Sequence, residues 1–248
     1  MLTGRCTLGV VITADLRSGD DIMELLMVTD ALRRLPGGRS AAIHLVVPYL
    51  PYARQDRVCN PGEALGLRVM CDLINAQGYA SVEVWDAHSD VALALLDRVI
   101  HVEAWRFVSA FYDPNMVMVA PDEGAVKRTH RCAQEVLADV VHAEKIRDTL
   151  TGEITGTEVH SQGVGSRDFL IVDDICDGGR TFIELAKKLR PLTTGKIYLY
   201  VTHAIMSKGL DVMRPFLDGI YTANSWVEDT SGFLRVVTIP STVYTKEY

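Results

Sequence analysis

The sequence predicts an α/β protein with two mainly parallel sheets. Short apolar runs, which are typical of strands buried on both faces, alternate with amphipathic segments that follow the helical period. This alternation occurs twice along the chain, so two similar domains are expected to meet near residue 104. Polar and charged clusters follow the expected strands, and ligands of such sheets bind beyond the carboxyl ends of the strands.

Apolar runs in the first half of the chain indicate strands, and amphipathic segments between them indicate helices. Asp20 or Asp21 should cap the first helix, because short polar side chains accept hydrogen bonds from the first N–H groups of a helix. Pro36, which is followed by two glycines, should end that helix. The expected strands are residues 8–12, 43–47 and 82–85, and the expected helices are residues 22–35 and 64–76.

The second half of the chain repeats the pattern. Residues 149–167 are rich in Gly, Thr and Ser, so a mobile loop is expected there. Pro215 should end the last helix. The expected strands are residues 116–119, 140–143, 169–172 and 197–201, with a weaker one near Ile220, and the expected helices are residues 125–138, 182–190 and 208–214.

Composition limits the classes of function. The net charge of −7 argues against a nucleic-acid surface, and if the ligands are phosphates it implies divalent cations that bridge carboxylate to phosphate. The five cysteines form no Cys-x-x-Cys pair, which indicates reduced thiols inside a cell. No apolar run reaches the roughly 18 residues of a membrane span, and the first run is too short for a signal peptide. A cytoplasmic protein without a nucleic-acid or membrane partner is therefore expected.

The stretch from residue 169 to residue 181 carries the strongest chemical signal. An apolar strand is followed by Asp173 and Asp174, and then by a loop with two glycines that leads into a helix. Backbone N–H groups at such a helix start can bind a phosphate, while the carboxylates can accept hydrogen bonds from sugar hydroxyls. A simple turn could use the same residues, and a Walker loop is excluded because no Gly-Lys-Ser/Thr follows. The loop residues are Asp177, Gly178, Gly179, Arg180 and Thr181.

Similar clusters follow other expected strands. A single cluster would be read as a solvated loop, but several at the same edge of parallel sheets indicate a ligand site. The clusters are residues 54–57, 86–90, 122–123, 145–147 and 173–177.

The order of these clusters resembles the ribose-phosphate pyrophosphokinase (PRPP synthetase) family, which has the type I phosphoribosyltransferase fold. The resemblance covers about residues 21–219, and its motifs are specific in conjunction. They are Met23-Glu24-Leu25, Pro48 to Asp56, Asp86-Ala87-His88, Pro121 to Gly124, Lys145-Ile146-Arg147, the Asp173-Asp174 stretch and Thr202-His203.

The resemblance implies two tandem phosphoribosyltransferase-like (Rossmann-like) domains. Residues 1–104 would form the ATP side, and residues 105–248 the ribose-phosphate side. It also implies a Mg²⁺-dependent reaction, in which the 1-hydroxyl of ribose 5-phosphate attacks the β-phosphorus of ATP and the products are PRPP and AMP. Such transfers depend on positioning and on charge neutralisation. A homo-oligomer is implied as well.

Roles follow for the residues that match the motifs of the first domain and the metal site. Arg54 and Gln55 match the ATP-binding pair, and Asp56 should support the nucleotide. His88 and Asp122 match the Mg²⁺ site. Imidazole is a poor Mg²⁺ ligand, so contact of His88 through water is expected.

Roles follow as well for the remaining motifs. Lys145 and Arg147 match a catalytic pair on a flexible loop, and with His88 they form the expected catalytic set. Their cations would stabilise charge on the transferring phosphoryl group. Asp173, Asp174 and the loop at residues 177–181 match the ribose-phosphate site.

The chain departs from the family pattern in three places. Family members carry an additional segment before the first strand, including a loop that reaches the adenine of a neighbouring subunit, so either the N-terminus is truncated or adenine recognition and assembly differ. Residues 236–248 lack the usual final helix. The family's Asp-Thr-Gly-x-Thr has Gly178 in place of its first Thr and gains Arg180, which removes a hydroxyl and adds a guanidinium.

Three alternatives stay open on the sequence alone. The acceptor could be a larger ribose 5-phosphate derivative such as ADP-ribose, in a reaction that serves NAD salvage. A phosphoribosyltransferase would share the fold but would not need the clusters at residues 54–56, 86–88 and 145–147. A non-catalytic regulatory homologue should have lost Lys145 or the metal residues, and this chain has them.

Overall fold

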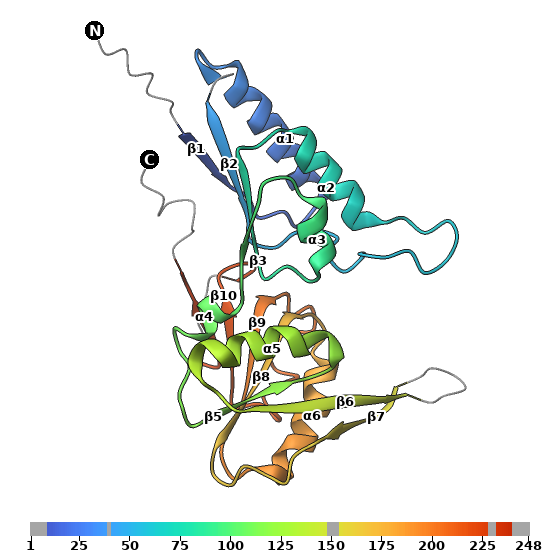
Figure 1. Ribbon diagram of the computed structural model, residues 1–248, viewed down its shortest axis with the longest axis vertical. Helices are drawn as coiled ribbons and strands as arrows, with labels where there is room; N and C mark the ends of the chain where they lie inside the picture. The colour runs from blue at the N-terminus through green and yellow to red at the C-terminus, as the bar shows by residue number, and fades with distance from the viewer. Residues whose placement is uncertain (1–8, 39–40, 148–153, 228–231, 240–248) are drawn as a thin grey trace. The chain divides into compact units, whose positions relative to one another are not determined.

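The structure, a computed structural model, describes residues 9–38, 41–147, 154–227 and 232–239. The chain divides into two compact units, whose described parts are residues 9–102 and 103–239 (Figure 1). Each unit has a mainly parallel sheet with helices, so the predicted α/β class is confirmed. None of the helices in the described ranges is both long and apolar enough to cross a membrane.

The first unit contains a four-stranded parallel sheet in the order β1-β2-β3-β4. Its core is formed by alternate strand residues such as Leu45 and Val84, which pack with Leu67 and Ile74 of the second helix. The strands are β1 (Gly9–Thr13), β2 (Ala42–Val47), β3 (Ser81–Trp85) and β4 (Val99–Val102), and the helices are α1 (Gly19–Arg34), α2 (Gly66–Ala76) and α3 (Asp90–Leu95).

The start of α1 differs from the sequence prediction. Its N-cap is Ser18, whose hydroxyl accepts a hydrogen bond from the backbone N–H of Asp21. The Asp21 carboxylate accepts in return from the backbone N–H of Ser18, at 2.6 Å. Asp21 therefore completes a capping box from inside the helix instead of capping it, and Asp20 lies in the first turn. The short elements α3 and β4 were not predicted.

The second unit contains a seven-stranded sheet in the order β11-β10-β9-β8-β5-β6-β7, in which only the β6–β7 pair is antiparallel. The strands are β5 (Met116–Ala120), β6 (Val140–Arg147), β7 (Ile154–Val159), β8 (Asp168–Cys176), β9 (Ile197–Ala204), β10 (Gly219–Ala223) and β11 (Leu234–Val237). The helices are α4 (Trp105–Val108), α5 (Glu123–Val136), α6 (Arg180–Leu189) and the 3₁₀ turn η2 (Arg190–Leu192).

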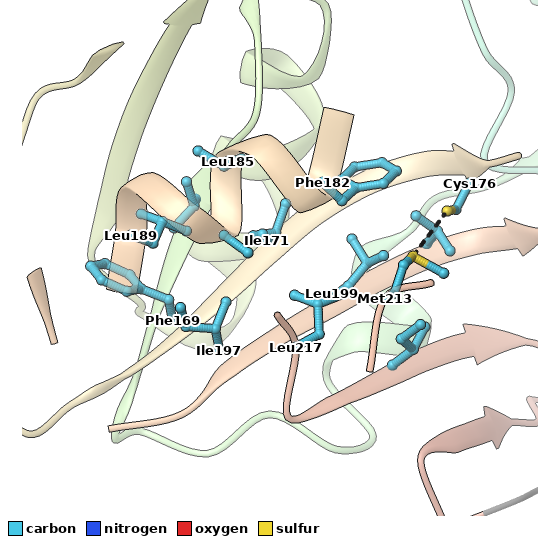
Figure 2. Packing of buried hydrophobic residues seen from close by; sticks show 14 of the residues in the cluster. Phe169, Ile171, Cys176, Phe182, Leu185, Leu189, Ile197, Leu199, Met213 and Leu217 are labelled. Atoms are coloured by element: carbon cyan, nitrogen blue, oxygen red, sulfur yellow. Dashed lines mark hydrogen bonds between the residues drawn. The ribbon is translucent and has the colours of Figure 1, made fainter. Parts of the chain in front are cut away.

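The core of the second unit lies between α6 and the central strands (Figure 2). Phe169 and Ile171 of β8 lie in one cluster with Phe182 and Leu185 of α6, and Figure 2 shows this helix packed over the strand. All four side chains are buried, and burial of each such side chain contributes about 1.5–3 kcal/mol. The packing fixes the start of α6 next to the end of β8.

Residues 154–159 form strand β7, so the prediction of a mobile loop over residues 149–167 is wrong for this part. β6 is also longer than predicted. It pairs with β5 only over residues 140–142 and continues with β7 alone, and we call residues 143–147 of β6 and residues 154–159 of β7 the arm (Figure 1). The Ile, Thr and Val residues of β7 favour a strand, and the Gly and Thr content concealed it. Only the backbone is described for residues 144–147 and 154–157.

The helix predicted at residues 208–214 is not formed. The segment makes successive turns, with backbone hydrogen bonds from Gly209 to Met206 and from Met213 to Leu210. Gly209 has a φ of +73°, which interrupts any helical run. The apolar residues Leu210 and Met213 were predicted to belong to a helix, but they attach a series of turns to the core.

Candidate active site

The acid pair, Asp173 and Asp174, lies within β8. The sequence had predicted that both acids follow the end of this strand. β8 continues to Cys176 because it stays paired with β9 up to that residue. Its pairing with β5 ends earlier, at Ile171. The acids therefore stand past the end of β5, where α5 follows, and the strand ladder fixes their backbone.

Arg128 of α5 contacts both acids. Its Nη1 lies 3.5 Å from Oδ1 of Asp173, and its Nη2 lies 3.7 Å from Oδ2 of Asp174. The side chains are 11%, 17% and 6% exposed, respectively, so water screens these charges weakly. The backbone N–H of Asp174 also donates to Oδ1 of Asp173, at 2.9 Å. Arg128 is thus the counter-ion that holds the acid pair in place.

Arg128 was not among the residues predicted from the sequence. A cation in the middle of a helix is usually on the solvated face, and α5 also carries the exposed Lys127 and Arg131. A signal was nevertheless available. Arg128 stands three residues after Ala125 and four before Cys132, both of which are buried, so it shares the inward face of α5.

The protonation of the acid pair depends on this environment. Burial raises the pKa of Asp173 well above its usual value, and the neighbouring charge of Asp174 raises it further, whereas Arg128 lowers it. Asp173 therefore retains its proton to higher pH than an exposed aspartate. A cation that binds beside the pair would favour the ionised form and release that proton.

The loop after β8 leads directly into the start of α6. The N-cap is Gly179, which has a φ of +75° and provides no side-chain cap. The first N–H groups of a helix lack partners within the helix, so this end can bind an anion. The predicted phosphate loop, Asp177 to Thr181, therefore leads into a helix start without a side-chain cap, and its binding of a phosphate stays a prediction.

Gly179→Ala is expected to destabilise the second unit. An added Cβ would stand 2.8 Å from Sδ of the buried Met213, in a backbone conformation that costs a non-glycine residue about 1–2 kcal/mol. Gly209→Ala is the matched control, because its φ is +73° and nothing lies within 4 Å of the added Cβ. Urea denaturation of both variants isolates the Met213 contact. Equal losses of stability would mean that Met213 does not restrain the loop.

Two cations flank the loop. Arg180 is exposed at the first position of α6. The aliphatic stem of Lys208 lies alongside Gly178, since a Cβ at Gly178 would be 3.8 Å from Cε of Lys208. The turn that carries Lys208 is tied to β8 by a hydrogen bond from the Met206 N–H to the Cys176 carbonyl, at 3.1 Å. Lys208 was missed because the sequence placed it on a helix.

Asp122 heads α5. Its φ of −163° and its position make it the N-cap, and its Oδ1 accepts from the backbone N–H of Ala125 at 3.2 Å. The local sequence explains this role, because Asp is among the best N-cap residues and Glu123 follows in the acidic first turn. Asp122 and Arg128 thus lie on the same helix, and that helix reaches the acid pair.

The predicted catalytic pair lies on the arm. Lys145 and Arg147 belong to β6, where Lys145 pairs with Thr157 and Arg147 pairs with Ile154. The register shifts between Ile146 and Arg147. The side chains of Lys145 and Arg147 lie outside the described part of the structure, so their role stays a prediction.

The predicted ATP-binding residues follow β2 in the first unit. The carbonyl of Gln55 accepts from the Leu67 N–H at 3.2 Å, which ties the loop to the start of α2. The Gln55 side chain rests against Gly66, where an added Cβ would overlap Oε1 of Gln55. Arg54 is exposed, whereas the side chain of Asp56 is only 7% exposed and pairs with Nε of Arg57 at 3.1 Å.

Asp56 connects this loop to the turn that carries His88. Burial alone would raise the pKa of Asp56, but Ser89, Arg57 and His88 outweigh it and lower the pKa. Asp56 is therefore ionised, and it lies close enough to His88 to sense its charge. The His88 turn is held from β4, where Nε2 of His101 accepts from the backbone N–H of Ala87 at 3.1 Å.

The donor atoms of the site suit Mg²⁺ better than a softer metal. Mg²⁺ is usually bound by one or two carboxylates, together with water and substrate phosphates. Asp122 and the acid pair offer carboxylate oxygens of this kind in the second unit. Over the described residues, no three His, Cys, Asp or Glu side chains gather into a metal centre. His88 belongs to the first unit, so its joint role with Asp122 stays a prediction.

Comparisons with known proteins agree on one family. A family model described as the N-terminal domain of ribose phosphate pyrophosphokinase matches residues 8–78. A ribose-phosphate pyrophosphokinase of Thermococcus kodakarensis is 31% identical over 77% of this chain and 67% of its own length. The corresponding protein of Mycoplasma pneumoniae is 32% identical over 76% of this chain, which spans only 58% of the relative's length.

A solved structure agrees with the fold. The phosphoribosylpyrophosphate synthetase of Mycobacterium smegmatis superposes with a TM-score of 0.76 and 24% identity, over 93% of this chain and 77% of that chain. This likeness confirms the predicted two-domain phosphoribosyltransferase-type architecture. The match to the Thermococcus protein shows that the chain belongs to the ribose-phosphate pyrophosphokinase family of enzymes.

Proposed function

We propose that this protein transfers the β,γ-diphosphate of ATP to the 1-hydroxyl of ribose 5-phosphate, giving PRPP and AMP in a Mg²⁺-dependent reaction. The observation that carries the proposal is the acid pair, held by Arg128 next to the uncapped start of α6. That combination suits a sugar phosphate, because the helix start receives the phosphate and the carboxylates receive the hydroxyls. In this scheme residues 1–104 form the ATP side and residues 105–248 the ribose-phosphate side.

The second unit would orient the acceptor. N–H groups at the start of α6 would bind the 5′-phosphate, while Asp173 and Asp174 accept hydrogen bonds from the 2- and 3-hydroxyls. With both ends fixed, the 1-hydroxyl is held in one orientation, and such positioning removes much of the entropic barrier to a two-substrate reaction. Ionised Asp173 is the better acceptor, so sugar binding should be coupled to loss of its proton.

The nucleotide would be held by Arg54, Gln55 and Asp56. Lys145 and Arg147 would neutralise charge that develops on the transferring group, which is the main contribution a protein makes to phosphoryl transfer. Mg²⁺, when bound, supplies further neutralisation of the phosphate oxygens. Asp122 would hold it directly, and His88 through water.

Asp122→Asn is expected to raise the Mg²⁺ concentration for half-maximal activity at least about tenfold. Asn caps a helix as well as Asp does, so α5 should keep its start while the site loses one negative charge. Glu123→Gln is the matched control, since it removes a charge from an exposed neighbour in the same turn. An identical Mg²⁺ titration for wild type and Asp122→Asn would remove Asp122 from the metal site.

One observation supports a second candidate acceptor. Gly178 stands where the family has a Thr, and the space beside it adjoins the stem of Lys208, with Arg180 two residues further on. Two cations near a loop that lacks the Thr side chain would suit a diphosphate, as in ADP-ribose. Such an acceptor would connect the reaction to NAD salvage. Alternatively, Arg180 replaces the lost hydroxyl and the acceptor remains ribose 5-phosphate, which we favour.

The acceptor is tested by measuring AMP release from ATP with ribose 5-phosphate and with ADP-ribose. We expect turnover with ribose 5-phosphate and a 10- to 100-fold lower kcat/KM in Arg180→Gly, which corresponds to about 1.5–3 kcal/mol for a hydrogen bond to a charged group. A higher kcat/KM for ADP-ribose would assign the larger acceptor. No AMP release with either compound would contradict the proposed reaction.

The setting of the reaction is part of the proposal. We place the protein in the cytoplasm, where ATP and ribose phosphates are available, as a homo-oligomer without nucleic-acid or membrane partners. The net charge of −7 supports the first exclusion.

A further inference from the structure

Two histidines outside the proposed active site face each other between α5 and β6. Nε2 of His130 lies 3.1 Å from Nε2 of His142, and both side chains are half-buried. They come from different elements, and His142 is the last residue of β6 that pairs with β5, where the arm begins. Nothing in the proposed reaction uses them.

The geometry of the pair differs from that of a straight hydrogen bond. In a straight N–H···N bond, two ring radii of about 1.15 Å each would add to the N···N distance and separate the ring centroids by about 5.4 Å. The observed centroid separation is 4.9 Å, and the ring planes are tilted by 35°. At least one ring axis is therefore turned well away from the N···N line, which weakens the direct hydrogen bond between the rings.

A shared metal ion accounts for these distances. With Zn–N bonds of about 2.0–2.1 Å, two nitrogens 3.1 Å apart subtend about 100° at the ion, which lies between the octahedral and the tetrahedral angle. The same arrangement places the centroids about 4.9 Å apart, in agreement with the observed value. We propose that His130 and His142 form a binding site for a borderline divalent transition-metal ion such as Zn²⁺ or Ni²⁺.

The ligand type separates this site from the Mg²⁺ site of the proposed reaction. Imidazole suits Zn²⁺, Ni²⁺ and Cu²⁺, whereas Mg²⁺ prefers oxygen ligands. The pair supplies two ligands, and water completes the coordination shell. A bound ion would join α5, which carries Asp122 and Arg128, to the base of the arm, which carries Lys145 and Arg147.

The test is calorimetric titration of the full chain with NiCl₂ and with ZnCl₂ in a buffer free of chelators. Wild type should bind one equivalent, and millimolar Mg²⁺ should not compete. His130→Ala and His142→Ala should each weaken binding at least about tenfold, since loss of even an outer partner of a metal ligand costs 10- to 100-fold. Arg131→Ala is the control, because this exposed neighbour of His130 on α5 has no metal-binding imidazole and should leave binding unchanged.

A spectroscopic measurement on wild type keeps the test independent of how the variants fold. With one equivalent of Cu²⁺, electron paramagnetic resonance should show two imidazole nitrogens on the copper. One nitrogen or none, the lack of a one-equivalent binding step in wild type, or an equal loss of binding in Arg131→Ala would each overturn the proposal. The histidines would then be a hydrogen-bonded structural pair.

Discussion

Replacing Lys145 with alanine is expected to lower kcat for the proposed reaction about a hundredfold or more. A cation that contacts the transferring group acts mainly in the transition state, so kcat should fall more than the affinity for either substrate. The fold should be unaffected, because Lys145 belongs to the arm, where β6 pairs with β7 alone. Arg147→Ala should behave similarly, and AMP release under saturating substrates is the measurement.

A surface lysine provides the control for Lys145. Lys187 of α6 is exposed and pairs with Glu184 at 2.8 Å, an i,i+3 contact of the kind that contributes little to stability. Lys187→Ala removes the same charge from the same unit, and its kcat should match that of wild type. Wild-type turnover in Lys145→Ala, with circular dichroism unchanged, would remove Lys145 from the catalytic set.

Arg128→Met is expected to destabilise the second unit in a pH-dependent manner. Removal of one partner from a buried ion pair costs about 3–5 kcal/mol, and uptake of a proton by the acid pair would offset part of this cost at low pH. Asp173 already has a raised pKa, so the native state binds more protons than the unfolded state and stability falls as pH rises through that range. Without Arg128, which lowers this pKa, the fall should extend to higher pH.

Urea denaturation at pH 5.5 and pH 8.0 measures this effect, and the loss should be larger at pH 8.0. Arg131→Met is the matched control, because Arg131 lies on the same helix and its pairs with Glu103 and Glu135 are exposed. It should cost less than about 1 kcal/mol at either pH. Adding Asp173→Asn to Arg128→Met should abolish most of the pH dependence. Losses that do not change with pH would mean that Arg128 stabilises the unit by packing alone.

The sequence was most informative where one physical effect dominates. β5 is buried along its whole length and appears as an uninterrupted apolar run, and β9, which is equally buried, begins with five apolar residues. The acid pair and the loop after it could be found because acids and glycines follow such a run directly. The ladder with β9 extends β8 past the last apolar residue of the run, and that pairing cannot be read from local composition.

The sequence was least informative where a side chain acts against the usual preference of its type. Arg128 is a cation on an inward helix face, and only its contact with the acid pair explains why it is buried there. Lys208 lies in a turn whose sequence was predicted to be helical. Its apolar residue Met213 packs into the core from the turn and is not part of a helix. β7 has strand-forming residues, but its partner β6 is needed before they pair.

The extension of β8 to Cys176 places the acid pair in the strand and the predicted phosphate loop after it, so substitutions in one need not alter the other. The acids are fixed by the ladder with β9, whereas the residues after Cys176 lie outside that ladder. In the proposed reaction, substitutions in the loop should therefore change phosphate binding without disturbing the carboxylates that receive the sugar hydroxyls. If the two parts of the acceptor are bound in this way, each can evolve separately, and a variant with Thr at position 178 and without Arg180 should change the preference between acceptors while the acid pair keeps its position.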